Sequence, residues 1–265
     1  MSLYNTMLFA AIIILVAFLP SIIYMKIFRN TEIFNREPWG NLFKAFFWGA
    51  FIAVIIGVIL SLILIEIIGM GLERQYEWFS SDSTYGVLIA ACFVAPLAEE
   101  FAKGLGVLMR WKDLTELENG FVYGVAVGVG FAATENLLYE VSALATAGVA
   151  AYIMTAILRS TLSAVLHGSS TSVMGYGIAR KRLLGTSIIP YYLLAVLMHG
   201  FFNFALTVSI LFSGDMQMVV GIVGFLVVIV YVRLTYSTVK RKIRELDRRY
   251  INPYHYQPYS GFRYR

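Results

Sequence analysis

Residues 87–109 read VLIAACFVAPLAEEFAKGLGVLM, an apolar run long enough to cross a bilayer that nevertheless contains Glu99, Glu100 and Lys103. A charge at the centre of a membrane helix costs roughly 2.5 to 3.5 kcal/mol on insertion scales, so such residues indicate a functional site by default. Other apolar runs of the chain also contain ionisable residues, namely Glu135, Arg159, His167 and His199. The apolar runs decide the fold, and their charged residues are the candidates for a site.

The composition indicates a membrane protein with several crossings. Hydrophobic residues make up 59% of the chain and charged residues 14%, and the mean hydropathy is +0.73, more apolar than the core of a water-soluble domain requires. With about 20 residues for each crossing, we expect an all-α bundle of about seven transmembrane helices. The runs lie near residues 3–25, 45–69, 84–109, 120–143, 147–179, 187–212 and 217–239.

The distribution of lysine and arginine predicts the topology, because positively charged loops tend to stay in the cytoplasm. Basic residues gather after the first, third and fifth runs and again after residue 239, whereas Arg74 is the one basic residue in an alternate loop. Seven crossings and this bias together predict an N-terminus outside the cell and a C-terminus in the cytoplasm. The first run lacks a basic start, so we expect it to be an uncleaved anchor.

The chain divides at residue 239 into two expected parts. Residues 1–239 form the integral membrane domain, and residues 240–265 form a basic, aromatic cytoplasmic tail. Such a tail suits the anionic surface of a lipid bilayer, and we favour this partner over nucleic acid. Cys92 is the only cysteine, so the chain has no internal disulfide.

Several of the ionisable residues are expected at one depth in the membrane. Counted at about 1.5 Å per residue from the nearest cytoplasmic end, Glu100, His167 and His199 come to a common level, roughly 15 to 20 Å deep. By the same count, Glu135 and Asn203 lie one turn further in. Four helices therefore contribute polar groups to one layer, as they do in a site inside a helical bundle.

Spacing within single helices suggests roles for some of these groups. Glu99 and Lys103 stand four residues apart with the acid first, the favourable order for an ion pair, which would leave Glu100 free to accept a proton from water. His199 and Asn203 are also four residues apart and share a helix face. The imidazole could bind a metal or exchange protons, and the amide could donate to a developing oxyanion.

Structural interpretations stand beside these. His167 could be a ligand or an interhelical hydrogen-bonding residue, and Glu135 could be a ligand or the partner of Arg159. We expect Arg159, Lys103 and Asn136 to support the site, with Asn136 capping or bridging helices. Four glycines with small-xxx-small spacings indicate close helix packing, or room for a substrate strand: Gly120, Gly124, Gly128 and Gly130.

Three motifs occur in order on successive apolar runs. AEEFAKG at 98–104 fits EExxK, FAATEN at 131–136 fits FxxxEN, and HGFFN at 199–203 follows His167 as a second histidine motif. In these motifs the chain resembles the PrsW family of intramembrane proteases over about residues 40–212. The resemblance extends to the wider superfamily that includes CAAX prenyl proteases and the scaffold subunit of γ-secretase.

The resemblance implies that Glu100 is the general base, with Glu99 beside it, and that Lys103 holds the acidic pair. It implies that a divalent metal, for which the donor set suits zinc, is bound by His167, His199 and Glu135. An activated water would attack a peptide carbonyl without an acyl-enzyme intermediate. Some relatives have also been interpreted as metal-free glutamate proteases, so both mechanisms stay open.

The same resemblance implies a substrate and a location. The substrate would be a single-span membrane protein such as an anti-sigma-factor-like regulator, in the cell membrane of a prokaryote. In one departure from the family, Asn119 stands before Gly120 where the family has an acidic residue.

Two other classes compete with a protease. A proton-coupled transporter also needs ionisable groups in the membrane, although the inverted repeats common in such proteins are not evident. A non-catalytic membrane scaffold would keep buried polar residues for assembly alone. Loss of substrate cleavage in Glu100→Gln with unchanged expression would favour the protease, whereas proton-coupled uptake by reconstituted protein would favour transport.

Overall fold

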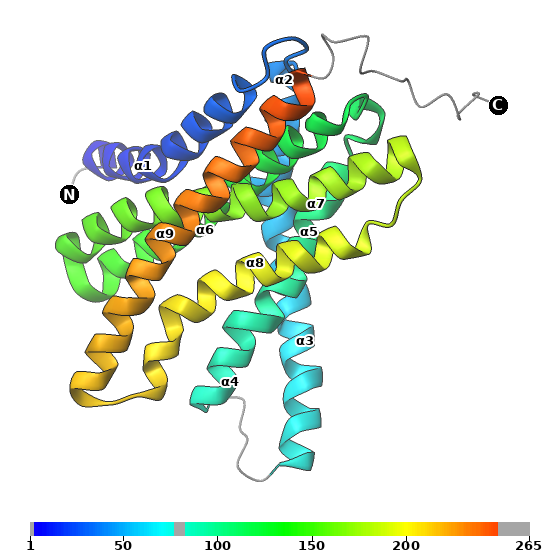
Figure 1. Ribbon diagram of the computed structural model, residues 1–265. Coiled ribbons are helices and arrows are strands. Elements are labelled where there is room, and N and C mark those ends of the chain that lie inside the picture. The colour runs from blue at the N-terminus through cyan, green and yellow to red at the C-terminus, as the bar shows by residue number, and fades with distance from the viewer. Residues whose placement is uncertain (1–2, 77–82, 249–265) are drawn as a thin grey trace.

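The structure is a computed structural model that describes residues 3–76 and 83–248, and in this part of the chain all regular structure is helical (Figure 1). The predicted all-α class is therefore confirmed. In chain order the helices are α1 (Leu3–Arg29), α2 (Trp39–Phe47), η1 (Trp48–Ala53), α3 (Val54–Gln75), α4 (Thr84–Ile89), η2 (Ala90–Val94), α5 (Ala95–Leu108), η3 (Trp111–Asp113), α6 (Leu117–Leu158), η4 (Arg159–Ser163), α7 (Ala164–Leu184), α8 (Ile189–Thr207), η5 (Val208–Leu211) and α9 (Gly214–Asp247).

Six segments of the described chain are long and apolar enough to cross a membrane, against the seven predicted. The difference falls in Leu117–Leu184, which joins two predicted crossings in one run of helix. Gly148 interrupts this run, because its φ of 81° and ψ of −170° are not helical and glycine tolerates a positive φ. The seventh crossing and the orientation of the termini stay predictions.

Helix α6 lies at the centre of the bundle. Residues 118–133 are all buried, as expected of a helix surrounded by protein on every side. A Cβ atom on Gly120, Gly124 or Gly128 would lie 2.3, 2.6 or 2.2 Å from a backbone oxygen of α7. The glycines thus let α7 run antiparallel against α6 at backbone contact, and the packing interpretation of this stripe is confirmed.

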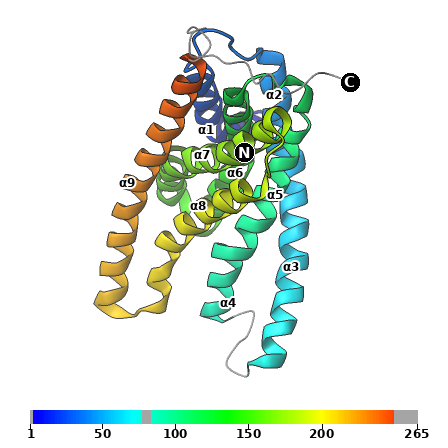
Figure 2. The same cartoon turned by 45° about the vertical axis from the view of Figure 1, so that its right-hand side comes forward.

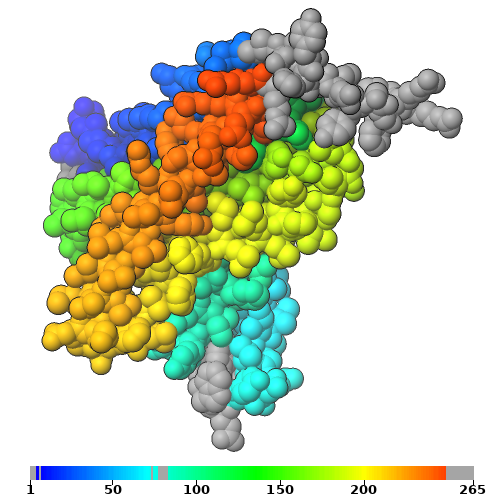
Figure 3. Space-filling view, in the orientation of Figure 1, coloured from blue at the N-terminus to red at the C-terminus, as the bar shows by residue number. Residues whose placement is uncertain are grey.

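The other helices surround this pair. Helices α1, α2 and α5 contact α6, α8 lies against α7, and α9 packs beside α8, as the two ribbon views show (Figures 1 and 2). In the space-filling view α9 and α8 form much of the outer face (Figure 3). Large apolar side chains point outward there, such as Leu197 at 68% and Val230 at 59% exposure. An apolar exterior of this extent belongs to an integral membrane protein.

Helix α9 continues through the predicted boundary at residue 239. Near its end the carboxylate of Asp247, 2% exposed, accepts hydrogen bonds from the backbone nitrogens of Ile33 (2.8 Å) and Phe34 (3.3 Å). These bonds attach the end of α9 to the connection between α1 and α2. Most of the predicted tail, residues 249–265, lies outside the described residues.

The same connection contains two buried acids. Glu32 accepts a hydrogen bond from the backbone nitrogen of Glu37 at 3.1 Å, and the Tyr123 hydroxyl donates to the Glu37 carboxylate. Burial raises the pKa of Glu32 to about 9 and that of Glu37 to about 7. Asp247 adds to the rise at Glu32 through its negative charge. Both acids therefore hold a proton in the folded chain well above their ordinary range.

Candidate active site

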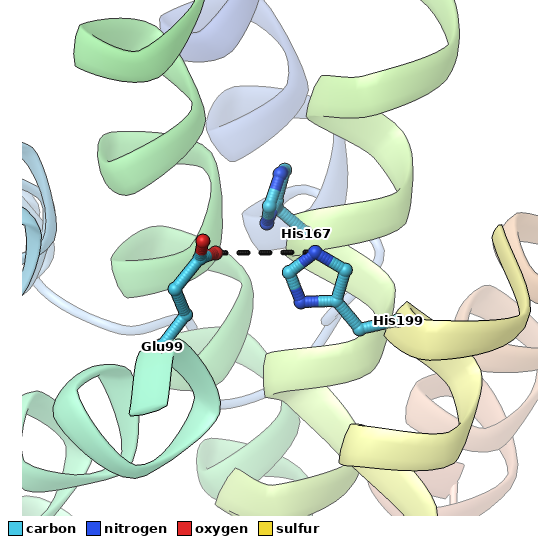
Figure 4. A group of neighbouring side chains, drawn as sticks. All are labelled: Glu99, His167 and His199. Atoms are coloured by element: carbon cyan, nitrogen blue, oxygen red, sulfur yellow. Dashed lines mark ion pairs between the residues drawn. The ribbon is translucent and has the colours of Figure 1, made fainter. Parts of the chain in front are cut away.

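Helices α5, α7 and α8 bring an acid and two histidines together inside the bundle. Figure 4 shows Glu99, His167 and His199 pointing toward one another. One carboxylate oxygen of Glu99 and one ring nitrogen of each histidine lie within 4.8 Å of one another. The two imidazole rings meet edge to face, with centroids 4.7 Å apart. The predicted convergence of these helices on one polar site is therefore confirmed.

Lys103 ties the two neighbouring acids of α5 together. Its buried ammonium lies 3.3 Å from Glu99 Oε2 and 2.9 Å from Glu100 Oε1. It also sits over the ring of Phe131, 4.1 Å from the centroid. The predicted Glu99–Lys103 ion pair is confirmed, but the same ammonium also neutralises Glu100.

Glu100 is surrounded by hydrogen-bond donors. Besides Lys103, its carboxylate accepts from Ser170 Oγ at 3.0 Å and Thr171 Oγ1 at 2.9 Å, both on α7. His199 Nδ1 lies 3.1 Å from the same carboxylate. The side chain is fully buried. The prediction that Glu100 is left without a partner is wrong, because donors from α5, α7 and α8 contact both of its oxygens. The role of general base stays a prediction.

His199 is oriented by Glu100. Since the carboxylate accepts the hydrogen of Nδ1, the other ring nitrogen, Nε2, carries a lone pair. This Nε2 is turned toward Glu99, 3.9 Å from Oε2. A carboxylate behind the histidine fixes the tautomer and raises the basicity of the ligating nitrogen in many metal sites. The arrangement prepares His199 to bind a metal ion.

His167 is held from both sides. Its Nδ1 lies 2.8 Å from Lys103 Nζ, and its Nε2 lies 2.8 Å from Glu135 Oε2. An ammonium can only donate, so Nδ1 accepts and Nε2 carries the hydrogen that Glu135 receives. Lys103 and Glu135 therefore engage the two ring nitrogens of His167.

Glu135 is not part of the compact donor group. The sequence predicted it as the carboxylate ligand, but the carboxylate within 4.8 Å of both histidines belongs to Glu99. The reason is the second partner of Glu135, Arg159, whose Nη2 lies 2.8 Å from Oε2. The Glu135–Arg159 ion pair was one of the two alternatives expected from the sequence, and it is confirmed. Glu135 lies at the edge of the site, and 21% of its side chain is exposed.

Arg159 connects the site with the surrounding helices. Its Nε donates to Asn136 Oδ1 at 3.0 Å and its Nη2 donates to Ser163 Oγ at 3.2 Å. Its guanidinium also lies 3.8 Å from the ring centroid of Tyr139. Asn136 and Arg159 thus bridge α6 and η4, which agrees with the supporting role expected for both.

Two of the three π-helical segments have a carbonyl that accepts from a neighbouring side chain. Such segments leave backbone carbonyls without regular α-helical partners, which neighbours must satisfy in a membrane. Thr134 Oγ1 donates to Ala50 O of η1 at 2.6 Å, and Asn203 Nδ2 donates to Ala91 O of η2 at 2.7 Å. The amide of Asn203, expected to stabilise an oxyanion, is engaged by the backbone that precedes Glu99, and the geometry does not support that expectation.

The donor set fits a divalent metal of the zinc type. Two imidazoles and one carboxylate are the protein ligands of many catalytic zinc sites, which keep a position open for water. His199 is already oriented for ligation, and Glu99 is the carboxylate nearest to its Nε2. Both ring nitrogens of His167 are engaged, Nδ1 with Lys103 and Nε2 with Glu135, so ligation by His167 would require one of these two contacts to be given up.

Sequence reasoning missed several polar residues around the site. Ser170 and Thr171 lie in the run GSSTS at 168–172, directly after His167, and this cluster of hydroxyls inside an apolar segment was a usable signal. Glu140 is fully buried, and its oxygens have no hydrogen-bond partner within the described residues.

Asn119, the departure from the family pattern, caps the start of α6. Its Oδ1 accepts from the backbone nitrogen of Glu116 at 2.6 Å, while the Glu116 side chain accepts from the backbone of Asn119. This reciprocal capping box needs a side-chain oxygen at residue 119, which asparagine supplies. The departure therefore leaves the local structure intact.

Comparisons with known proteins find one matching family and two similar proteins. The family model described as PrsW family intramembrane metalloprotease matches residues 37–233. Protease PrsW of Clostridioides difficile is 31% identical over 205 residues, which cover 74% of this chain and 79% of that protein. Protease PrsW of Oceanobacillus iheyensis is 30% identical over 139 residues, covering 50% of this chain and 61% of that protein. No solved structure matches the chain.

Proposed function

Because the chain belongs to the PrsW family of intramembrane proteases, we propose that it hydrolyses a peptide bond of membrane-anchored proteins at the group formed by Glu99, His167 and His199. The observation that carries this proposal is the compact donor set of one carboxylate and two imidazoles within 4.8 Å, inside a membrane bundle. The wider superfamily relationship expected from the motifs is part of the same proposal.

Glu99, His167 and His199 would hold a divalent metal, and zinc suits them best. A bound metal of this kind polarises the substrate carbonyl and lowers the pKa of water. Glu100 keeps the lone pair of His199 directed into the site through the 3.1 Å bond to Nδ1. The Lys103 ammonium neutralises Glu100 and holds Glu99 beside Glu100 by pairing with both carboxylates.

Glu135 is the acid best placed to act as general base. Its Oε2 lies 2.8 Å from His167 Nε2, and 21% of its side chain is exposed, although Oε2 itself is buried. Arg159 pairs with the carboxylate at 2.8 Å and keeps it ionised, at the cost of a lower proton affinity that the approach of substrate must offset. The carboxylate takes a proton from water while the water oxygen attacks the peptide carbonyl carbon. It then gives that proton to the leaving amine as the C–N bond breaks.

The substrate would be a single-span membrane protein, such as an anti-sigma-factor-like regulator. The described residues contain six segments long and apolar enough to cross a membrane, which supports a substrate held in the same bilayer and reaching the site laterally. Both relatives are bacterial, and we place the protein in a bacterial cell membrane.

Cleavage of a single-span test substrate in reconstituted vesicles tests the proposal. Glu99→Gln and Glu135→Gln should each reduce cleavage at least about 100-fold, the scale expected for a lost acid-base or electrostatic group. Glu66→Gln, an exposed acid of α3, is the matched control and should cleave normally. Cleavage unchanged in both site variants would refute the proposal.

Metal analysis supplies the second arm. Purified protein loaded with zinc should hold about one ion per chain, and Glu99→Gln should hold less. Glu135→Gln should keep the ion and still lack activity. Full activity after complete removal of metal with a chelator would show that the enzyme works by acid-base catalysis alone and needs no metal.

A further inference from the structure

A cavity of about 100 Å³ lies beside the candidate site, between η4, α8 and α9. Its walls are mainly apolar, with one guanidinium and one hydroxyl among them. The lining residues are Leu158, Arg159, Leu162, Ser163, Phe202, Leu206 and Phe225. We propose that this cavity receives an apolar side chain of the substrate next to the peptide bond that is cut, an inference that rests on the proposed protease function.

The wall formed by Arg159 connects the cavity to the site. Arg159 Nη2 lies 2.8 Å from Glu135 Oε2, and the same oxygen lies 2.8 Å from His167 Nε2. Two polar contacts therefore separate the cavity wall from the donor group. A residue whose side chain fills the cavity has its backbone close to Glu135, where the proposed base acts.

Helix α8 makes a second connection. Phe202 follows His199 by three residues, which places both side chains on neighbouring positions of one helix face. Phe202 is 6% exposed and His199 is 2% exposed. The buried face of α8 thus carries a ligand candidate at one turn and a cavity wall at the next.

The charged wall argues against a simple crevice for a lipid chain. Arg159 is paired with Glu135, and this places a polar ion pair, unsuited to contact with a lipid chain, at the wall of the cavity. Arg159 is held by Asn136 and Ser163, which position it at this wall. It belongs to the π-helical segment η4, and such segments are frequent at functional sites.

The volume sets the size of the side chain. A cavity of about 150 Å³ lined by Leu, Ile and Phe holds a benzene ring, so about 100 Å³ suits a branched aliphatic group. Leucine, isoleucine and valine fit, whereas tryptophan is too large and alanine leaves the cavity mostly unfilled. We expect the wild-type enzyme to prefer leucine to alanine at one substrate position.

Size-swap variants test the inference. The cut in a single-span test substrate is located by mass spectrometry, and each residue within three positions of it is then changed to Ala, Leu or Trp. At one position the wild type should cut the Leu substrate about 10-fold or more faster than the Ala substrate. Phe225→Ala, which enlarges the cavity, should raise cleavage of the Trp substrate. Leu162→Trp, which fills the cavity, should reverse the preference toward Ala.

Controls separate the outcomes. Leu226→Ala changes the neighbouring, 56% exposed residue of α9 and should leave every preference unchanged. Gained cleavage of the Trp substrate supports the inference, because misfolding cannot produce it. Preferences that stay the same in both cavity variants, or an equal loss on all substrates, overturn the inference while the protease function stands. If the wild type cuts none of the substrates, the proposed function fails as well.

Discussion

His199 donates its Nδ1 hydrogen to Glu100, 3.1 Å away, and the opposite nitrogen of the ring therefore faces Glu99. Consecutive residues of a helix point about 100° apart, so the two acids, although both lie near Lys103 and His199, approach opposite nitrogens of the His199 ring. Glu99 completes the donor group, and Glu100 positions one of its histidines from behind.

The first prediction separates these two acids. Glu100→Gln should weaken zinc binding about 10- to 100-fold, the usual effect of losing a partner behind a ligand, and added zinc should restore cleavage. Glu99→Gln should stay inactive at any zinc concentration because a ligand is missing. Zinc titrations that follow both binding and cleavage check this. A Glu100→Gln variant that binds zinc normally and yet is inactive would return the role of base to Glu100.

A second prediction concerns Asn203. Asn203→Ala leaves the Ala91 carbonyl of η2 without its donor, so the free energy of unfolding should fall by about 1 to 3 kcal/mol. Thr134→Ala removes the donor to the Ala50 carbonyl of η1 and should lower the free energy of unfolding by a similar amount. Thermal unfolding in mild detergent, with cleavage measured per folded molecule, checks this. Normal stability with a large loss of kcat in Asn203→Ala would favour the oxyanion role instead.

The third prediction uses the close approach of α6 and α7. A Cβ at residue 128 would lie 2.2 Å from the backbone oxygen of His167, so Gly128→Ala must push the two helices apart and displace this histidine. Zinc affinity and stability should both fall. Gly71→Ala is the matched control, because nothing lies within 4 Å of its added methyl group. Equal behaviour of the two variants would contradict the packing described for α6.

The fourth prediction concerns pH and Glu32, outside the membrane-spanning segments. The unfolded chain loses this proton near pH 4.5, whereas the folded chain keeps it to about pH 9 because the carboxyl is buried. The folded state binds more protons between these values, so the free energy of unfolding falls as the pH rises. Glu32→Gln should flatten this fall, and unfolding curves across the range check it.

Glu37 contributes to the slope left in that variant. Because its pKa is about 7, its own share of the loss of stability ends near pH 7. Glu66→Gln, which changes an exposed acid, should reproduce the wild-type slope. A slope unchanged in Glu32→Gln would show that this carboxyl does not hold its proton in the folded protein.

The sequence predicted the all-α class and the gathering of the ionisable residues inside the bundle. Apolar run length identifies membrane helices because each must span about 30 Å of hydrocarbon, and ionisable residues stand out there because they are costly. The common depth of Glu100, His167 and His199 followed from helix rise alone, and the structure places these three in contact with Lys103 or with one another.

The roles of the acids could not be predicted in the same way. Which of Glu99 and Glu100 faces the histidines depends on helix rotation, and the π-helical segment η2 before them changes the regular period. The hydroxyls of Ser170 and Thr171 saturate Glu100 across the interface between α5 and α7. Periodicity within one helix does not contain such contacts between helices.

The segment η2 has a consequence for insertions and deletions. Its hydrogen bonds run from residue i to i+5, so it absorbs one residue more than an α-helical turn. Shortening residues 90–94 by one should restore an ordinary turn and leave Glu99 and Glu100 aimed as before. Residues 95–98 belong to the regular α-helix α5, which has no extra residue to lose. Removing one residue there would rotate the two carboxylates by about 100° around the helix axis. Because η2 contains one residue more than an α-helical turn, a one-residue deletion within residues 90–94 should be tolerated. The same deletion within residues 95–98 should inactivate the enzyme.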